Sequence, residues 1–214
     1  TAVAMARATP PDPLAGVAAP ELLARNLPQL DLVSAYLPES EELKALALAV
    51  EGAALAVPGV SKSGGASASA SQRKIALVTS AGFAQAYQRT GVSLSVSAIA
   101  GEGTGMERDY DYSAACHFGD LKTPQEVGKS AGERAVKRLQ ARKIASQAVT
   151  VIYDRRVASS LLGHLSSAIN GAAIARGTSF LKSRMDQQIF SKGISVVDDP
   201  LRQRGLASRP FDGE

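Results

Sequence analysis

The sequence predicts an α+β fold, a twisted antiparallel β-meander flanked by helices and followed by a strand–helix unit. Val92, Leu94 and Val96 alternate with serines, which is the period of a half-buried strand. Short glycine-containing turns separate the strand-like runs, and connections this short make neighbouring strands antiparallel. Apolar residues recur every four positions within 124–143, as on the buried face of a helix.

The first 60 residues are predicted to hold helices joined by proline-rich connectors. Helices are expected at 2–8, at 21–26, and from Ser40 as N-cap to about residue 56, where Pro58-Gly59 ends the pattern. The next segment, SKSGGASASASQ, has low complexity. It can form a flexible loop or continue into a strand, and both alternatives stay open.

Four strands are predicted after this segment, at 73–80, 83–89, 92–100 and 108–115. In the last of them, Asp109 and Asp111 lie opposite Tyr110 and Tyr112. The two carboxylates share one side of the strand and could hold a cation or a basic peptide. The solvated face of a half-buried strand explains them more simply.

A helix is predicted from Pro124 to about residue 143, with Thr123 as its N-cap. Its buried stripe comprises Val127, Ala131, Ala135 and Leu139. Its basic residues occupy the rest of the circumference and are interpreted as a solvated face, since no aromatic residues are interleaved for base stacking.

A strand at 149–152 and a following helix form the predicted strand–helix unit, and 194–197 is a further short strand. Asp154 stands where a helix N-cap is expected. One buried helix face is predicted from residues at helical spacing, namely Val157, Leu161, Leu165, Ala168 and Ala172. His164 is the one side chain on this helix able to bind a metal or move a proton.

The composition limits the classes of function. The net charge of +4 is mild, and aromatic residues make up 5% of the chain, so direct contact with nucleic acid is not expected. The single cysteine, Cys116, allows no intrachain disulfide, which fits a reducing cytoplasm. No apolar run approaches the ~20 residues needed to cross a membrane, and residues 1–13 do not read as a secretory signal.

Other motifs are explained by structure rather than chemistry. Gly101, Gly103 and Gly105 precede a strand instead of the helix that a dinucleotide site needs, so a hairpin loop is expected. Cys116 and His117 would point to opposite faces of a strand and are not a catalytic pair. Ser159 and Ser160, on the helix of His164, lack the strand–turn geometry of a serine nucleophile.

Five segments together carry a resemblance to the PmbA/TldD family, whose older label is "modulator of DNA gyrase". Besides 149–181, they are GVSLSVSAIAGEGTGMERDYDYSAA (91–115), GERAVKRLQARKI (132–144), ARGTSFL (175–181) and SRPFDGE (208–214). The resemblance covers most of the chain from about Ala45. It implies a further segment before Thr1 and a β-rich domain after Glu214. We expect domains at 1–72, 73–145 and 146–214, the last one being the start of a C-terminal region.

The protease subunit of this family resembles the chain but carries an H-E-x-x-x-H motif on the helix of His164. Two imidazoles on successive turns hold zinc there, and the glutamate serves as general base. Anchoring on the turn at 177–179 aligns the motif with Leu162, Gly163 and Ser167, which cannot replace it. His164 lies two residues from the first ligand position, and we expect it to be a half-buried packing residue.

The resemblance therefore implies a PmbA-type subunit with no catalytic, cofactor-binding or metal-binding residue of its own. Zinc is expected in a TldD-like protease partner, which acts on peptides or small unfolded proteins in the cytoplasm. A homodimer is also possible, and exposed strand edges at 92–100 and 108–115 could pair with substrate. The alternative function is a regulatory or binding protein acting on DNA gyrase or another protein.

Overall fold

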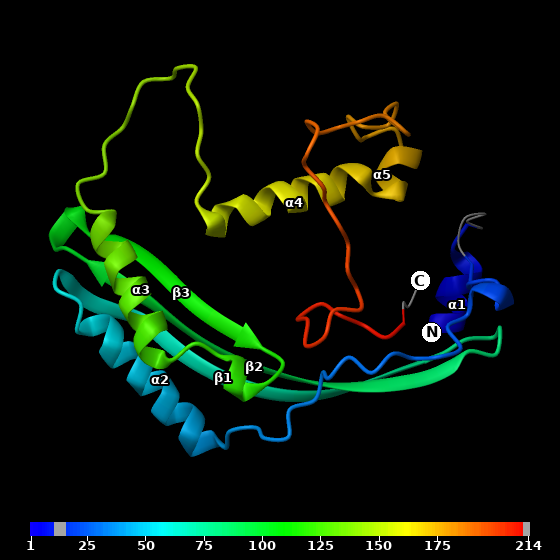
Figure 1. The fold of residues 1–214 in the computed structure, drawn as a ribbon, viewed down its shortest axis with the longest axis horizontal. Helices are drawn as coiled ribbons and strands as arrows, with labels where there is room; N and C mark the ends of the chain where they lie inside the picture. The colour runs from blue at the N-terminus through cyan, green and yellow to red at the C-terminus, as the bar shows by residue number, and fades with distance from the viewer. Residues whose placement is uncertain (11–15, 212–214) are drawn as a thin grey trace. The chain divides into compact units, whose positions relative to one another are not determined.

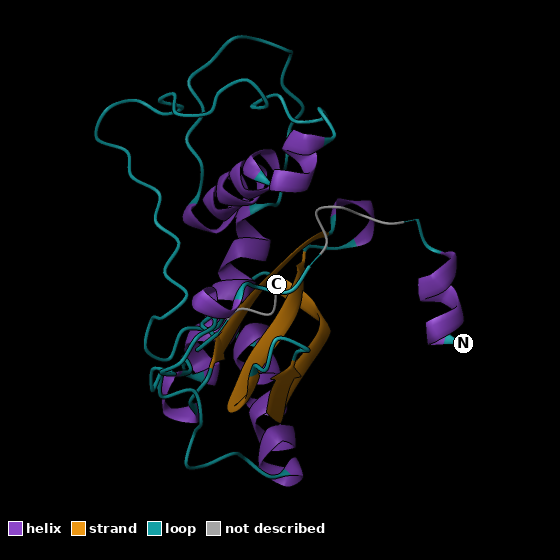
Figure 2. Cartoon of the chain, turned by 90° about the vertical axis from the view of Figure 1, so that its right-hand side faces the viewer, coloured by secondary structure: helices purple, strands orange, loops and turns teal. Residues whose placement is uncertain are grey.

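A three-stranded antiparallel sheet is the centre of the fold in the computed structural model, which describes residues 1–10 and 16–211 (Figure 1, Figure 2). Across the sheet, the strands are β1 (Val60–Val78), β2 (Ala84–Ala100) and β3 (Glu107–Ala115). The α+β class and the antiparallel meander are confirmed. The prediction of four strands is wrong, since the described residues form three.

The fourth strand disappears because 83–89 and 92–100 are parts of one strand, β2. Thr90 and Gly91, expected to form a turn, pair with Gln72 and Ser71 of β1. The low-complexity segment is strand rather than loop, and its Ala66 and Ala68 pack against the core cluster. β1 therefore continues through residues 72 and 73, where the sequence suggested a domain limit.

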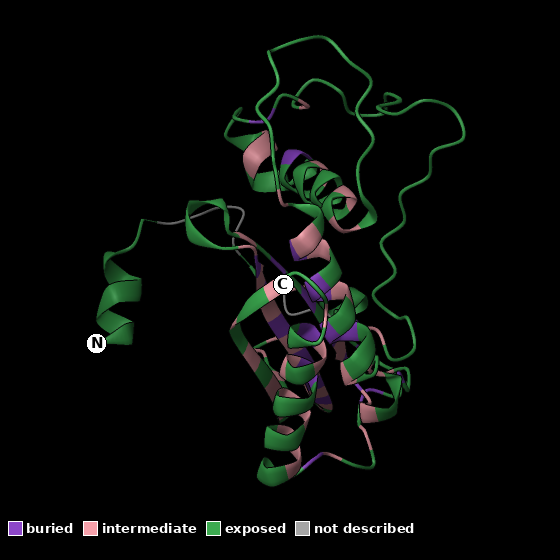
Figure 3. Cartoon of the chain, turned by 90° about the vertical axis from the view of Figure 1, so that its left-hand side faces the viewer, coloured by how far each residue is buried: buried purple, intermediate pink, exposed green. Residues whose placement is uncertain are grey.

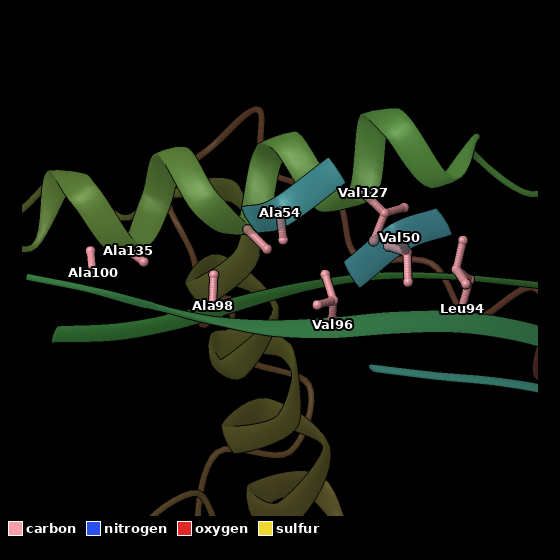
Figure 4. Close-up of a cluster of buried hydrophobic side chains, with 9 residues drawn as sticks. Val50, Ala54, Leu94, Val96, Ala98, Ala100, Val127 and Ala135 are labelled. Carbon is pink, nitrogen blue, oxygen red and sulfur yellow. The ribbon is translucent and has the colours of Figure 1, made fainter. Parts of the chain in front are cut away.

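Two helices cover one face of the sheet and enclose the core (Figure 4). α2 (Ser40–Leu55) packs on β1 and β2, and α3 (Pro124–Lys137) packs on β2 and β3. Both helices contribute to one cluster of buried side chains: Val50, Ala54, Leu94, Val96, Ala98, Ala100, Val127, Ala131 and Ala135. The stripe predicted for α3 is thus confirmed, with Leu139 partly buried against the same cluster.

The ends of these helices differ slightly from the prediction. Thr123 caps α3 as expected, since its hydroxyl accepts from the Glu126 amide and the Glu126 carboxylate accepts from the Thr123 amide. α3 ends at Lys137, six residues before the predicted end at 143. α2 has Glu39 at the N-cap position, and Ser40 is its first helical residue.

The structure divides into two units, and the first comprises Thr1–Ala141 together with Asp199–Glu214. The later segment is held to the rest of this unit by aromatic and ionic contacts. The Phe211 ring lies edge-on to Phe83 and Tyr87, with ring centroids 5.2 Å away in both cases. Arg204 donates to Asp31 at 2.5 Å and lies 3.3 Å from Asp120.

The second unit, Arg142–Asp198, contains α4 (Arg155–Ile169) and α5 (Gly171–Ala175). The strands predicted at 149–152 and 194–197 are wrong, because these residues lie outside any helix or strand. A strand needs a hydrogen-bonded neighbour, and within the described residues neither segment has one. Most residues of this unit are exposed, as Figure 3 shows.

The remaining elements are short. α1 (Ala2–Ala8) confirms the predicted first helix, and a 3-10 turn, η1 (Pro20–Leu22), stands where a helix at 21–26 was expected. Two further 3-10 turns are η2 (Gly103–Gly105) and η3 (Phe118–Asp120). η2 lies in the β2–β3 hairpin, so the prediction of a hairpin loop at these glycines is confirmed.

Candidate functional site

The helix α4 begins where the sequence predicted. Asp154 is its N-cap, and its Oδ1 accepts a hydrogen bond from the Arg156 amide at 2.9 Å. The hydroxyls of Ser159 and Ser160 donate to the carbonyls of Arg156 and Val157 at 3.1 and 2.7 Å. Both serine hydroxyls therefore bond to the backbone of their own helix.

The turn at 177–179 is fastened to the end of α4. Gly177 adopts a φ of 68°, which favours glycine, and it follows Arg176, the C-cap of α5. Ser179 is buried, and its hydroxyl donates to the Ala168 carbonyl at 2.6 Å. This hydrogen bond holds the turn next to the end of α4, close to Ser167, the last of the three residues aligned with the family motif.

Those α4 positions do not fit a zinc ion. Leu162 is 55% exposed, a Cβ on Gly163 would meet nothing within 4 Å, and Ser167 is exposed. Zinc in proteins is held by several imidazole, thiolate or carboxylate groups, which these residues lack. In residues 1–10 and 16–211, no three His, Cys, Asp or Glu side chains are grouped to hold a metal.

Two predictions about the burial of α4 are wrong. His164 is exposed rather than half-buried. Of the expected buried face, Ala168 alone is buried, Leu165 is half-buried, and Val157 and Leu161 are 51% and 48% exposed. Ala172 lies in α5 and is exposed as well. The face has the spacing of a packing surface, but within the second unit no strand or long helix lies against it.

The aspartates of β3 face the helices rather than solvent, so the prediction of a solvated Asp face is wrong. Asp109 and Asp111 are 7% and 8% exposed, whereas Tyr110 and Tyr112 are 51% and 53% exposed. Asp111 pairs directly with Val96 of β2, and paired residues project to the same face. Burial of Val96 in the core therefore carries Asp111 inward.

Both carboxylates are occupied by internal hydrogen bonds. Asp109 Oδ1 accepts from the Tyr110 amide at 2.7 Å, and Asp111 Oδ1 accepts from the Tyr112 amide at 2.8 Å. Arg138 Nη1 also lies 3.7 Å from Asp109 Oδ2. Because the two amides belong to alternate residues of an edge strand, we infer that they lie on the edge away from β2. The carboxylates thus cover that edge.

Cys116 and His117 have separate partners. The buried Cys116 thiol donates to the Gly205 carbonyl at 3.7 Å and lies 3.5 Å from Arg89 Nη2. His117 Nε2 lies 2.8 Å from the Asp31 carbonyl oxygen.

A groove runs beside the part of β2 that extends beyond β3. β3 pairs with β2 from Val92 onward, so residues 84–91 have β1 on one side only. The Thr90 amide donates to Leu32 at 2.9 Å, away from β1. Backbone groups alternate in direction, so those of Ala86 and Gln88 also face away from β1. They line a groove of about 350 Å³ with residues 27–33 and Pro210. Sequence patterns did not indicate it, because it depends on the unequal strand lengths.

Among the helices of the described part of the chain, none combines the length and the apolar character needed to cross a membrane.

Comparison with known proteins gives matches along most of the chain. The family model described as "PmbA/TldA metallopeptidase central domain" matches residues 36–139, and the "PmbA/TldA metallopeptidase C-terminal domain" model matches residues 146–214. "Metalloprotease PmbA" of Escherichia coli O157:H7 is 38% identical over the whole chain and 48% of its own length. A "Metalloprotease PmbA homolog" of Haemophilus influenzae is 34% identical with the same coverage. The chain spans about half the length of these relatives.

Two solved structures have a similar fold. A Bacteroides thetaiotaomicron protein named as a modulator of DNA gyrase matches with a TM-score of 0.89 and 26% identity, over 99% of this chain and 49% of its own. A Thermotoga maritima protein of the same description matches with a TM-score of 0.75 and 20% identity, over 88% and 44%, which supports the fold alone. From these family models and relatives, together with its fold, the chain belongs to the PmbA/TldD metallopeptidase family.

Proposed function

We propose that this chain is part of a PmbA-type subunit that takes part in proteolysis of peptides or small unfolded proteins without being catalytic itself. The observation that carries the proposal is the chemistry of α4. Leu162, Gly163 and Ser167 offer neither a pair of imidazoles nor a carboxylate base, and hydrolysis at zinc requires both.

The metal and the base would come from a TldD-like protease subunit in a heterodimer. The family scaffold is retained here, since both family models match, and α4 is capped by Asp154 and tied to the turn at Ser179. A retained scaffold without metal chemistry is what an assembly partner requires. The single buried thiol, Cys116, is compatible with the reducing cytoplasm in which we place the complex.

Substrate would contact this subunit through its main chain. The open edge of β2 at Ala86 and Gln88 presents backbone donors and acceptors along a groove, as strand addition needs. The two edges first considered are less suitable. Residues 92–100 pair on both sides, and the Tyr110 and Tyr112 amides already donate to carboxylates.

A photoreactive residue at the exposed Gln88 tests this contact in the reconstituted complex. The expected result is a crosslink to an unfolded peptide at position 88 and none from the same group at Arg108, an exposed residue of β3. Crosslinks confined to the partner subunit would rule out the edge of β2 as a substrate site.

A reconstitution assay tests the subunit role. Cleavage of an unfolded peptide is measured with the full-length protein, with the partner, with both, and with both after removal of a histidine in the partner's motif. We expect cleavage by the intact pair alone. Full activity of the partner by itself would contradict the subunit role, and activity of this protein by itself would contradict the non-catalytic role.

The second candidate, regulation of DNA gyrase, is favoured by the description of the two similar structures as modulators of that enzyme. A gyrase supercoiling assay separates the two functions. If the full-length protein changes supercoiling when its partner is catalytically inactive, the regulatory function is favoured. If an effect requires an active partner, proteolysis is sufficient to explain it.

A further inference from the structure

Two arginines lie directly opposite each other on neighbouring strands. Arg73 of β1 pairs with Arg89 of β2 in the antiparallel register. Directly paired residues project to the same face, with Cβ atoms about 4.5–5.5 Å apart, and like charges in this position repel. Such a pair costs stability in the absence of a counter-charge.

No carboxylate of the described chain supplies that counter-charge, since neither arginine forms an ion pair there. Arg89 is instead anchored by Nη2, which donates to the Leu206 carbonyl at 2.6 Å and lies 3.5 Å from Cys116 Sγ. A guanidinium has five N–H donors, so most of those of Arg89 stay available. Arg73 is exposed and can move toward a ligand.

The two side chains line a cavity of about 250 Å³. Its other lining residues are Ser71, Thr90, Gly91 and Leu206. Gly91 has no positive φ, so the backbone does not require glycine there. The missing side chain leaves space beside Arg89, and the Ser71 hydroxyl lies at the edge of that space, 3.4 Å from the Gly91 carbonyl.

We propose that Arg73 and Arg89 bind a carboxylate of a peptide, either its C-terminal group or an acidic side chain. Two guanidinium groups match the geometry of a carboxylate through paired, charge-assisted hydrogen bonds. The site adjoins the open edge of β2, since Gln88 at that edge precedes Arg89. The peptide as ligand rests on the proposed function, whereas the anion site rests on the arginine pair itself.

Isothermal titration calorimetry of the full-length protein tests the site with three peptides that are built on one sequence without charged side chains. The first has a free C-terminus, the second is amidated, and the third is amidated with a glutamate as its last residue. We expect the free acid to bind at least about tenfold more tightly than the neutral amide, as charged hydrogen bonds imply. The glutamate peptide shows whether a side-chain carboxylate serves equally well. Binding of both carboxylate peptides no tighter than that of the neutral amide would overturn the proposal.

Two matched substitutions separate local recognition from general charge. Arg73→Gln is expected to lower the affinity for the free-acid peptide by about tenfold or more. Lys74→Gln removes the same charge from the adjacent, exposed residue on the opposite face and should change affinity less than about twofold. Equal losses in both variants would contradict a built site.

A third variant changes the cavity and keeps both arginines. Gly91→Val is compatible with strand backbone, fills the space beside Arg89, and should also abolish the preference for the free acid. Unchanged binding in this variant would contradict the site. If inorganic phosphate binds and the free-acid peptide does not, the peptide assignment is overturned. All of these measurements use binding without the partner, so their outcome is independent of the cleavage assay.

Discussion

At the scale of single residues, the aspartates of β3 protect a strand edge. Unpaired amides on an edge strand are a template for pairing with other chains. Asp109 and Asp111 each accept a hydrogen bond from the amide of the following tyrosine. Both side chains face α3 and bond to the backbone. These contacts account for aspartates at the two positions without a bound metal or ligand.

Substitution of Asp111 tests this interpretation. Asp111→Ala should lower the free energy of unfolding by about 1–3 kcal/mol, because the Tyr112 amide loses its acceptor. It should also increase aggregation, measured by light scattering. Asp111→Asn keeps an acceptor oxygen and should aggregate no more than the wild type. Equal aggregation of the two variants would contradict edge protection by the hydrogen bond.

The cap of α3 predicts a pH dependence. Hydrogen bonds from the backbone and side chain of Thr123 lower the pKa of Glu126 below its ordinary value of 4.5. The ionised carboxylate therefore stabilises the folded state at pH values above 4.5, and this contribution is lost as the pH falls through the lowered pKa.

Glu126→Gln tests the sign of this effect. Urea unfolding should show the variant to be less stable than the wild type at pH 7, and the difference should shrink at about pH 3. Glu51→Gln, on α2, serves as the control. A difference for Glu126→Gln that stays constant over this range would contradict the prediction.

At the scale of elements, α2 and α3 approach closely because glycines stand at their contact. A Cβ on Gly128 would lie 2.5 Å from the Val50 carbonyl oxygen and 2.6 Å from the Ala53 Cβ. One on Gly132 would lie 2.6 Å from Val57 Cγ2. The small side chains of α2 and α3 therefore allow the two helix backbones to pack closely together.

Gly128→Ala and Gly163→Ala should have opposite effects. The first forces α2 and α3 apart and should destabilise the fold by about 1–3 kcal/mol. The second adds a methyl group in open space on α4 and should be neutral or stabilise the helix by up to about 1 kcal/mol. Urea unfolding of both variants measures this. A loss of stability for Gly163→Ala similar to that of Gly128→Ala would contradict the description of α4.

The helices were predictable from sequence because their signals are local. The caps at Thr123 and Asp154 and the stripe from Val127 to Ala135 identify α3 and α4 without knowledge of the fold. The strands were less predictable. Thr90-Gly91 resembles a turn, and only pairing with β1 makes it the middle of a long strand.

Site residues followed the same rule. The sequence alone shows that Leu162, Gly163 and Ser167 have no imidazole or carboxylate group with which to bind zinc or accept a proton. The inward direction of Asp111 depends on its register against Val96, and the arginine pair depends on the register of β1 against β2. The alternation of residues in the sequence shows which side chains share a face of a strand. It does not show which of the two faces is buried when both carry polar residues.

At the scale of the whole molecule, the chain has the family fold, and Leu162, Gly163 and Ser167 of α4 carry no imidazole or carboxylate group. The first unit contains the two surfaces that we propose to bind peptide, namely the open edge of β2 and the arginine pair. The second unit contains α4, which is capped by Asp154 and tied to the turn at Ser179. We therefore propose that this chain binds peptide and that hydrolysis takes place in a partner.

The zinc content of the purified full-length protein distinguishes a binding subunit from a metallopeptidase. Metal analysis after exposure to zinc and removal of loosely bound ions should find far less than one zinc per molecule. The TldD-type partner treated in the same way should retain about one, as its complete motif predicts. One tightly bound zinc in this protein alone, together with cleavage of an unfolded peptide, would contradict the account.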